Sequence, residues 1–554
     1  TINGAVCQTV CENGISRVSL PLDTETEGLF FFHFELEQNG CLTFLSPDGI
    51  TDRFAGEWQL LVCNDRYPSE YGFSGGAIYH IFVDRFAKGG DYPPRSDAIM
   101  LDWEKDTPEY AEKPGDFLRN NTFFGGTLTG IADKLDYISS LGVDLIYLSP
   151  VFTAYSNHKY DTGDYMSVDP MFGGDEALKT LIDGCHKRGI RIILDGVFNH
   201  VGDDSIYFDS GNKYGGALHN PSSPYREWFN ISPDGGYECW WGVKNLPKVI
   251  KCDSFRSYIC DTVIPKYMKM GIDGWRLDVV DEYPESFLER ITSASKSIDR
   301  NAYILGEVWE DASNKIAYGE RKKYLCGNAL DGVMNYPFKN AVLDFVKGKP
   351  AEQAANEILT ICEHYPAPAM DTALNFLSTH DTERALTVIA DEPANGRGRA
   401  WQSGRCVTGD AYEEGLLRLR MAYAIIYTLP GVPCLYYGDE IAMQGYRDPF
   451  NRAFFRWDAH EQRLRPVLAQ LAQLRHTCEA FRTGQLRVLR AEDGILHYQR
   501  VGKVETAEII VNRTEHIIVE TLASGKSTEV NPMGFTIVVE EVGHNPDHSY
   551  YDYV

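Results

Sequence analysis

A long alternation of strand-like and helix-like segments is the feature that most limits how this chain can fold. From Gly75 to about residue 480, short apolar runs bounded by turn residues alternate with stretches in which apolar residues recur every three or four positions, as in Ile131, Leu135, Ile138 and Leu141. Eight strand candidates stand out, at residues 77–83, 145–148, 191–197, 274–279, 303–308, 332–335, 374–377 and 432–436.

Eight strand and helix units of this size predict an α/β fold, the (β/α)8 TIM barrel. A doubly wound open parallel sheet is the structural alternative, but the chain has no glycine-rich phosphate-binding fingerprint to support it. We therefore predict a catalytic barrel over residues 75–481, in which functional groups gather at the carboxyl ends of the strands.

Segments of a different character flank and interrupt the predicted barrel. Residues 1–74 and 482–554 alternate apolar and polar positions in short runs, which is typical of small β-sandwiches. Residues 201–252, after the third strand candidate, are rich in Gly, Pro, Asn and Trp and are too long for an ordinary connection. We predict an N-terminal β-sandwich, a C-terminal β-sandwich, and an inserted domain B that overhangs the barrel mouth.

The charge balance narrows the class of partner. The chain has 53 Lys and Arg against 79 Asp and Glu, a net charge of −26. Such a chain repels nucleic acid and anionic lipid and favours a neutral or cationic partner. No apolar run of ~18 residues is free of helix breakers, so we expect no membrane span.

Cysteine usage bears on the compartment. The 13 cysteines are scattered and form no CxxC pair, which is typical of reduced thiols and favours the cytoplasm. Because the chain starts Thr-Ile-Asn, an export signal removed by processing is the alternative.

Ionisable side chains follow four of the predicted strands at the end where a barrel carries its active site. They are Asp195, His200, Arg276, Asp278, Glu307, His380 and Asp381. Each alone is explained equally well by a helix cap or a loop hydrogen bond. Because residues from four strands gather at one face of the barrel, they instead indicate a shared site.

The residue types suggest a reaction. Arg276 and Asp278 are two residues apart on a strand and so point to the same side, where the guanidinium keeps the carboxylate ionised. A structural ion pair is the alternative for this pair alone. Glu307, on the next strand, is expected at roughly 5 to 5.5 Å from Asp278, the separation of retaining glycoside hydrolysis. Val308 and Trp309 predict an apolar setting that suits Glu307 as the general acid.

A third carboxylate completes the predicted site. Asp381, with His200 and His380, is placed to hold sugar hydroxyls and to stabilise the positive charge of an oxocarbenium-like transition state. An acidic pocket also agrees with the charge balance and with a neutral carbohydrate substrate.

With these residues in these positions, the chain resembles the α-amylase family, glycoside hydrolase family 13. The resemblance runs from about Gly75 to the C-terminus, and six segments carry it in order: residues 142–150, 195–200, 274–278, 306–309, 378–381 and 431–440. It implies that Asp278 is the nucleophile, Glu307 the general acid/base and Asp381 the transition-state stabiliser. It also implies glucose-binding positions at subsite −1 for Arg276, Asp195, His200 and His380.

Loop residues extend the resemblance. Tyr160 matches the aromatic residue that stacks on the −1 glucose, and His158 matches a binding histidine. Asp448 and Arg452 match a pair that clamps the same sugar. In the predicted domain B, Trp240 and Trp241 are candidate sugar platforms, with buried packing expected for at least one of them.

Within the family, residues 81–86, 124–128 and 158–165 most resemble the neopullulanase, cyclomaltodextrinase and maltogenic amylase subgroup, in which homodimers are typical. Three departures occur. The N-terminal region, about 74 residues, is shorter than that subgroup's starch-binding-type module. Residues 246–250 read Leu-Pro-Lys-Val-Ile where the subgroup usually has Met-Pro-Lys-Leu-Asn, and residues 279–282 read Val-Val-Asp-Glu where it often has Val-Ala-Asn-Glu. Glu282, the last residue of the second segment, keeps the subgroup's residue type and is a further candidate for substrate binding.

The resemblance leads to three hypotheses. The first is a retaining hydrolase of α-1,4 bonds in maltooligosaccharides, cyclodextrins, pullulan or starch. The second is a transglycosylase that uses the same covalent intermediate, and the third is a non-catalytic carbohydrate-binding protein, which the presence of all three carboxylates disfavours. The chemistry requires no cofactor. A structural Ca²⁺ is open, with Asn199 and residues 88–91 as oxygen donors, but no segment has the ligand-dense spacing of a calcium loop, so no ligands are assigned.

Overall fold

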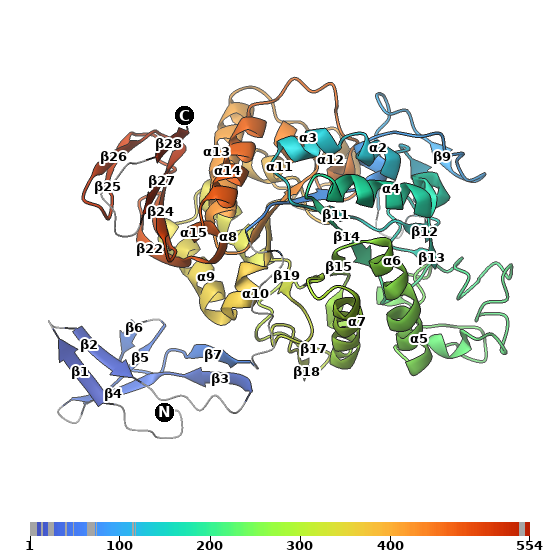
Figure 1. Ribbon diagram of the computed structural model, residues 1–554, viewed down its shortest axis with the longest axis horizontal. Coiled ribbons are helices and arrows are strands. Elements are labelled where there is room, and N and C mark those ends of the chain that lie inside the picture. Colours follow the sequence, from blue (N-terminus) through green and yellow to red (C-terminus); the bar gives the residue numbers. More distant parts are fainter. Residues whose placement is uncertain are drawn as a thin grey trace.

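A parallel β-barrel lies at the centre of the computed structural model, which describes residues 8–12, 15–19, 27–38, 41–47, 49–63, 73, 75–113, 116, 118–541 and 549–553 (Figure 1). One sheet has the strand order β19-β16-β15-β14-β11-β8-β21-β20, and a parallel bridge between Met334 and Leu374 joins its two ends. The strands are β8 (Ile78–Ile81), β11 (Leu145–Leu148), β14 (Arg191–Gly196), β15 (Gly274–Leu277), β16 (Tyr303–Gly306), β19 (Gly332–Val333), β20 (Leu374–Phe376) and β21 (Val432–Tyr436). The predicted (β/α)8 barrel is confirmed.

Several strands end earlier than the sequence predicts. The first ends at Ile81 rather than at residue 83, because the chain turns there into α1 (Val83–Phe86). Within that turn the Asp84 carboxylate accepts the backbone N–H groups of Phe124 and Gly125 at 3.0 Å each. Similarly, Asp278 and Glu307 follow their strands instead of ending them, which leaves their side chains at the barrel mouth.

Two sets of apolar side chains hold the barrel together. Alternate strand residues such as Ile78, Leu145 and Leu305 pack inside it, since successive side chains of a strand point to opposite faces. The outward set packs under the helices that surround the sheet. The main covering helices are α4 (Gly174–His186), α6 (Ile264–Met270), α7 (Glu285–Ile298), α8 (Tyr336–Lys347), α9 (Ala351–His364), α11 (Ala385–Ala390), α13 (Gly409–Thr428) and α14 (Leu464–Thr477).

The helix predicted around Ile131 is split in two. Its residues form α2 (Leu128–Ala132) and α3 (Leu135–Ser140), with a turn at Asp133 and Lys134. The four apolar side chains that suggested one helix are still buried. The four side chains can be buried on one face because the two short helices keep the same spacing between them. None of the described helices combines the length and apolarity needed to cross a membrane.

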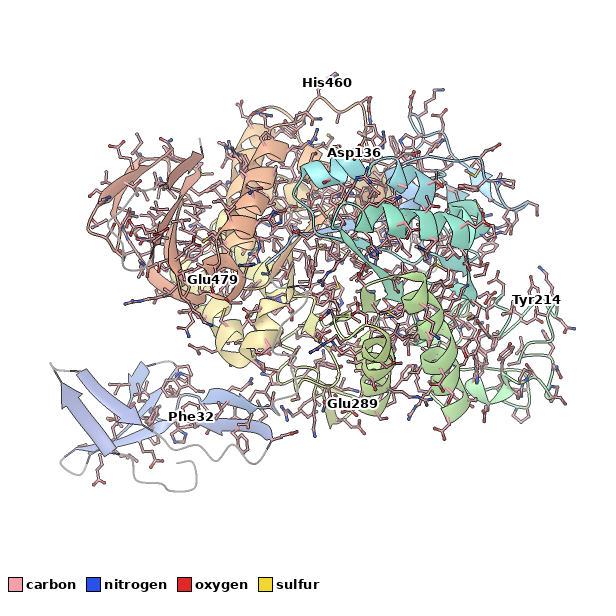
Figure 2. The ribbon with its side chains drawn as sticks, viewed as in Figure 1. Phe32, Asp136, Tyr214, Glu289, His460 and Glu479 are labelled. Carbon is pink, nitrogen blue, oxygen red and sulfur yellow. The ribbon has the colours of Figure 1, made fainter. Side chains whose placement is uncertain are left out.

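Small antiparallel sheets precede and follow the barrel. The N-terminal ones comprise β1 (Gln8–Glu12) with β2 (Ile15–Ser19), β3 (Gly28–Phe32) with β7 (Trp58–Val62), and β4 (Phe34–Gln38), β5 (Cys41–Ser46) and β6 (Gly49–Thr51). Phe32, labelled in Figure 2, stacks on Trp58 at a centroid distance of 5.6 Å. Gln59 joins this region to the barrel, because its Nε2 donates to Ser313 Oγ at 2.6 Å.

The C-terminal sheet has the order β22-β23-β24-β27-β28 and packs beside α9 and α13 (Figure 1). Its strands are β22 (Gln485–Glu492), β23 (Ile495–Val501), β24 (Glu505–Asn512), β27 (Gly534–Glu541) and β28 (Ser549–Tyr553). A hairpin of β25 (Ile518–Thr521) and β26 (Ser527–Val530) lies against it, and the apolar residues between them include Ile510 and Leu522. Two small antiparallel layers around their own core agree with the predicted fold class.

Residues 201–252, between β14 and α5 (Asp253–Tyr258), contain little regular structure. Aromatic side chains, among them Tyr207, Phe208 and Trp228, form their core. Trp240 and Trp241 of this insertion line the cavity at the barrel mouth, which is the overhang that the sequence predicts.

Candidate active site

Arg276 lies fully buried on β15, where it joins carboxylates from three neighbouring strands. Its Nη1 donates to Asp195 Oδ1 at 2.9 Å and to Asp278 Oδ1 at 2.8 Å. Its Nη2 forms an ion pair with Glu307 Oε2 at 2.9 Å. Arg276 and Asp278 therefore lie on one side of the strand, as their spacing predicts, and the same guanidinium also contacts Glu307, which the sequence did not indicate.

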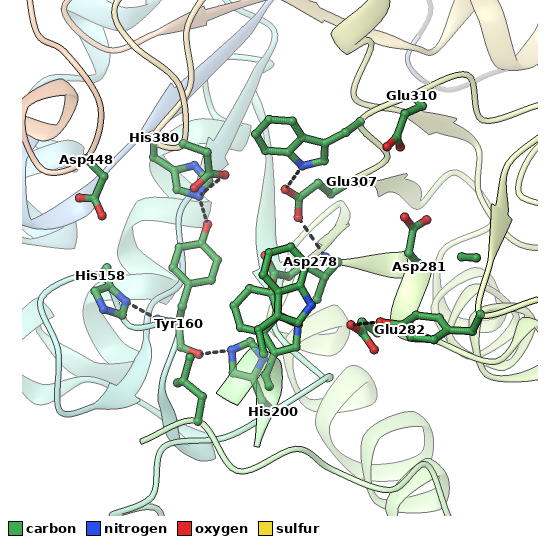
Figure 3. A pocket seen from close by; sticks show the side chains of 18 of the residues that line it. His158, Tyr160, His200, Asp278, Asp281, Glu282, Glu307, Glu310, His380 and Asp448 are labelled. Atoms are coloured by element: carbon green, nitrogen blue, oxygen red, sulfur yellow. Dashed lines mark hydrogen bonds and ion pairs between the residues drawn. The ribbon is translucent and has the colours of Figure 1, made fainter. Parts of the chain in front are cut away.

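Asp278 and Glu307 occupy equivalent positions on adjacent strands. β15 and β16 pair in parallel with Leu277 opposite Gly306, so Asp278 and Glu307 are the next residues of this register. Because neighbouring strands lie about 4.8 Å apart, the two carboxyl groups start from backbone positions that suit the retaining separation of roughly 5 to 5.5 Å. Both side chains line the same cavity (Figure 3).

Val279 fixes Glu307 from the other side. Its φ of 42° is in the left-handed region, which is strained for a β-branched residue. In this conformation the Val279 N–H donates to Glu307 Oε2 at 2.9 Å. The backbone immediately after Asp278 thus holds the carboxyl group of Glu307, so the two positions are coupled.

The surroundings of Glu307 differ from those predicted. Trp309 was expected to form an apolar wall, but its indole Nε1 donates to Glu307 Oε1 at 2.9 Å. The Trp309 ring stacks on Tyr336, with ring centroids 4.2 Å apart. Only Val308 is a purely apolar neighbour in sequence, and it packs in the main hydrophobic core. The prediction was wrong because an indole supplies a donor as well as an apolar surface.

Asp195 anchors two tyrosines beneath the site. Its Oδ2 accepts the hydroxyl of Tyr147 at 2.6 Å and that of Tyr160 at 2.8 Å, while Arg276 holds the other oxygen. Asp195 is therefore fully engaged with protein partners. It positions Tyr160 and Arg276 for any ligand in the cavity.

Three histidines hold Tyr160 in place (Figure 3). The Tyr160 hydroxyl lies 2.5 Å from His380 Nε2, and the two rings are parallel to within 12°. His200 Nε2 contacts the Tyr160 carbonyl oxygen at 3.1 Å. His158 Nδ1 accepts the Tyr160 N–H at 3.1 Å. The predicted sugar-stacking residue is thus rigidly held at the cavity wall.

Asp381 lies across the mouth from Glu307, between a histidine and an arginine. Its Oδ2 is 3.1 Å from His380 Nε2, and its Oδ1 is 3.5 Å from Arg452 Nη2. Arg452 also pairs with Asp448 at 3.0 Å and donates through Nε to the His380 carbonyl oxygen at 2.8 Å. The structure thus brings the predicted Asp448 and Arg452 pair to the same end of the cavity as Asp381.

Burial and crowding of like charges shift the pKa values of the acids. Burial raises the pKa of Asp278 well above its usual range, Arg276 opposes the rise, and Glu307 adds to it. Burial and the Glu307 carboxylate raise the pKa of Asp381 to about 7, against the effect of Arg452. Because these carboxylates and Asp195 lie close together around Arg276, they titrate as a coupled group rather than one by one.

The histidines are held neutral. Burial and Lys251 lower the pKa of His200 to about 3. Burial also lowers the pKa values of His158 and His380 well below their usual range, and nearby basic groups, Arg452 among them, reinforce the effect. Neutral imidazoles can both donate and accept hydrogen bonds, as sugar hydroxyls require.

The cavity has a volume of ≈930 Å³ and extends to both sides of Glu307 and Asp278. This is at the upper end of the range of small-ligand sites, ~300–1,000 Å³. In Figure 3, His158 and Asp448 lie on one side of Glu307 and Asp278, and Glu282 lies on the other. Trp241, 81% exposed, lines the second end, where its ring stacks on Trp240 at 5.2 Å.

All the residues predicted for the site, except the fully buried Arg276 and Asp195, line this cavity. They are His158, Tyr160, His200, Trp241, Asp278, Glu282, Glu307, His380, Asp381, Asp448 and Arg452. Sequence reasoning missed Tyr147, the donor role of Trp309, and Tyr318, which lines the second end. Period-two alternation in β11 places Tyr147 inside the barrel and could have identified it, whereas nothing in the pattern marks Tyr318.

Of the oxygens suggested for Ca²⁺, those of Asn199 have another partner. Lys251 Nζ donates to Asn199 Oδ1 at 2.7 Å, to the Asn199 carbonyl oxygen at 3.2 Å and to the Val249 carbonyl oxygen at 2.9 Å. An ammonium group in this cage does not fit a bound cation beside it. Across the part of the chain that the structure describes, no group of three or more His, Cys, Asp or Glu could hold a metal ion. We therefore derive no chemistry from a metal.

Comparison with known proteins agrees with this geometry. Residues 80–483 match the family described as "Alpha amylase, catalytic domain". The chain is 36% identical over 450 residues to a cyclomaltodextrinase of Geobacillus thermopakistaniensis, an alignment that covers 79% of this chain and 68% of that protein. It is 34% identical over 507 residues to an amylopullulanase of Thermoanaerobacter thermohydrosulfuricus, covering 81% of this chain and 33% of that protein. The chain thus spans about a third of the length of that amylopullulanase.

Solved structures show the same fold. The ligand-free cyclic α-maltosyl-(1→6)-maltose hydrolase of Arthrobacter globiformis superposes with a TM-score of 0.71 at 29% identity, covering 84% of this chain and 98% of that one. The type III pullulan hydrolase of Thermococcus kodakarensis gives a TM-score of 0.72 at 25% identity, covering 92% of this chain and 89% of that one.

Proposed function

The chain belongs to the α-amylase family, glycoside hydrolase family 13, and from this premise we propose that it is a retaining α-glucan hydrolase that cleaves α-1,4-glucosidic bonds by double displacement. The observation that carries the proposal is the register of β15 and β16, which sets Asp278 beside Glu307 with one guanidinium contacting both. This is the arrangement that a nucleophile and an acid/base of a retaining glycosidase require.

In the first step, Asp278 attacks the anomeric carbon of the sugar in subsite −1 while Glu307 gives a proton to the departing glycosidic oxygen. Arg276 favours the ionised form of Asp278 against the opposing effect of burial. The C–O bond to the leaving chain breaks as the bond to Asp278 forms.

In the second step, water enters from the vacated side and Glu307, now a carboxylate, removes its proton. The oxygen attacks the anomeric carbon, the bond to Asp278 breaks, and the sugar is released with its original α-configuration. In both steps Asp381 stabilises the oxocarbenium-like charge and contacts sugar hydroxyls, while Tyr160 stacks on the ring.

The substrates we favour are maltooligosaccharides, cyclodextrins, pullulan and starch. Support comes from the names of similar proteins, which include cyclomaltodextrinase, amylopullulanase and neopullulanase. A homodimer, typical of this subgroup, is a separate prediction that light scattering tests.

Transfer to a sugar is the second candidate activity. The observation in its favour is the exposed indole of Trp241 at the end of the cavity beyond Glu307, where an acceptor sugar would stack. Hydrolysis and transfer share the covalent intermediate and differ only in the attacking hydroxyl. Product lengths measured at high maltose concentration separate them, because transfer creates chains longer than the substrate.

Proton NMR of the first product tests the proposal. β-Cyclodextrin, pullulan, soluble starch and maltotriose are each incubated with the enzyme, and the initial anomer and the product lengths are recorded. We expect the α-anomer from at least one substrate. An initial β-anomer, or no cleavage of any of the four, contradicts the proposal.

A further inference from the structure

A short hairpin lines the end of the cavity beyond Glu307. It consists of β17 (Ile316–Ala317) and β18 (Glu320–Arg321), and its tip is Tyr318 with Gly319. Both tip residues have positive φ, 54° and 80°. This is the conformation of a type I′ turn, which tyrosine adopts only when its surroundings hold it there. Tyr318 lines the cavity with 69% of its surface exposed.

The loop after β15 supplies that hold. The Tyr318 hydroxyl donates to Glu282 Oε1. At the base of the hairpin, Lys315 pairs with Asp281 at 3.1 Å, and the Tyr324 hydroxyl donates to Asp281 at 2.7 Å. The hairpin is therefore docked on two consecutive acids, Asp281 and Glu282. Asp281 is also where the sequence departs from the subgroup's usual asparagine, and a carboxylate pairs with Lys315 as an amide does not.

The inserted domain B adds a third connection. Lys248 Nζ pairs with Glu282 Oε2 at 3.0 Å and lies 5.5 Å from the centre of the Tyr318 ring. Trp241, from the same insertion, lines this end of the cavity together with Tyr318. Tyr318, Glu282, Lys248 and Trp241, which we call the clasp, come from three separate loops. Tyr318, Glu282 and Trp241 line the cavity at the end where Glu282 lies in Figure 3, opposite His158 and Asp448, and Lys248 holds Glu282 and Tyr318 from domain B.

We propose that the clasp limits the length of the leaving chain. Short reducing-end chains fit beside the clasp, whereas long ones are sterically blocked by it. The inference rests on the proposed function, because Glu307 protonates the glycosidic oxygen and the leaving chain must then extend away from subsite −1 toward the clasp. Tyr318 is the specificity-determining residue. Its ring is exposed, so its removal opens this end of the cavity without disturbing the core.

The test compares kcat/KM for a long linear amylose with kcat/KM for maltotriose in four proteins. They are the wild type, Tyr318→Ala, Tyr318→Phe and Tyr214→Ala. Tyr214, 62% exposed, lies at the outer edge of domain B (Figure 2) and outside the cavity, so it is the matched control. KM and kcat are determined separately for each substrate, and circular dichroism checks folding.

We expect Tyr318→Ala to raise the ratio of long to short substrate about tenfold, which corresponds to ~1.4 kcal/mol, while Tyr214→Ala keeps the wild-type ratio. Tyr318→Phe should raise it less, because the ring remains and only the bond to Glu282 is lost. An unchanged or lower ratio in Tyr318→Ala, with both substrates still cleaved, overturns the clasp alone. A wild type that cleaves neither substrate overturns the clasp and the proposed function together.

Discussion

Replacing Arg452 by glutamine should move the acid limb of the pH profile upward. Arg452 lies 3.5 Å from Asp381 and 3.0 Å from Asp448. Removing its charge takes away an attraction that lowers the pKa of Asp381 and leaves the Asp448 carboxylate to raise it further. For the Arg452 and Asp381 charges at 3.5 Å, Coulomb's law with an effective dielectric constant of ~20 gives an attraction of at most about 5 kcal/mol. Measured shifts for an aspartate beside an arginine are about 1 to 3 units.

Solvent screening reduces the pKa shift expected for Asp381, because 28% of its side chain is exposed. We therefore expect a rise of about 1 to 2 units from a starting pKa of about 7. The sign follows from the mechanism. Asp381 must be ionised to stabilise positive charge, and a higher pKa means that it takes up its proton, and activity is lost, at a higher pH.

The assay is kcat/KM for maltotriose from about pH 4 to 9, which reports apparent pKa values of the free enzyme's coupled cluster. Arg452→Lys keeps the charge and serves as the matched control, since its limb should stay near that of the wild type even if the rate falls. If the acid limb of the pH profile does not move in Arg452→Gln, or if it moves equally in both variants, the electrostatic reasoning is refuted.

Three further predictions concern the nucleophile, the oxygens that hold Lys251, and bound metal. Asp278→Asn should lower kcat by about 10⁴-fold or more while leaving the melting temperature near the wild-type value, and near-normal turnover of the folded variant would exclude a nucleophilic role. Lys251→Met leaves three carbonyl-type oxygens of Asn199 and Val249 without their donor, so it should destabilise the protein by about 1 to 3 kcal/mol, measured by thermal denaturation beside the exposed control Lys244→Met. EDTA should leave the wild-type melting temperature unchanged, and a large drop would reveal a metal site that these oxygens do not explain.

The strands and the central carboxylates could be predicted because they depend on local patterns. Alternation along a strand puts Arg276 and Asp278 on one side, and the common carboxyl end of parallel strands brings Glu307 to them. The positions of Tyr160 and His158 came from resemblance. Their loop has no periodic pattern that would have placed them.

Other features depend on how separate loops pack, which no local pattern encodes. Val279 adopts a left-handed conformation disfavoured by its own side chain, because the loop is held between Asp278 and Glu307. The Tyr318 hairpin has only two residues in each strand and is positioned by acids about 36 residues away. The end of the first strand at Ile81 likewise follows from Asp84 binding a distant turn.

Trapping the covalent intermediate tests the central claim most directly. Glu307→Gln lacks the acid, but an α-maltosyl fluoride needs no protonation of its leaving group, so Asp278 can still attack; without a general base, hydrolysis of the intermediate is then slow. We predict that intact-mass analysis shows the addition of one maltosyl unit and that peptide mapping places it on Asp278. A label on another residue, or complete turnover to the β-anomer with no adduct, would contradict the account.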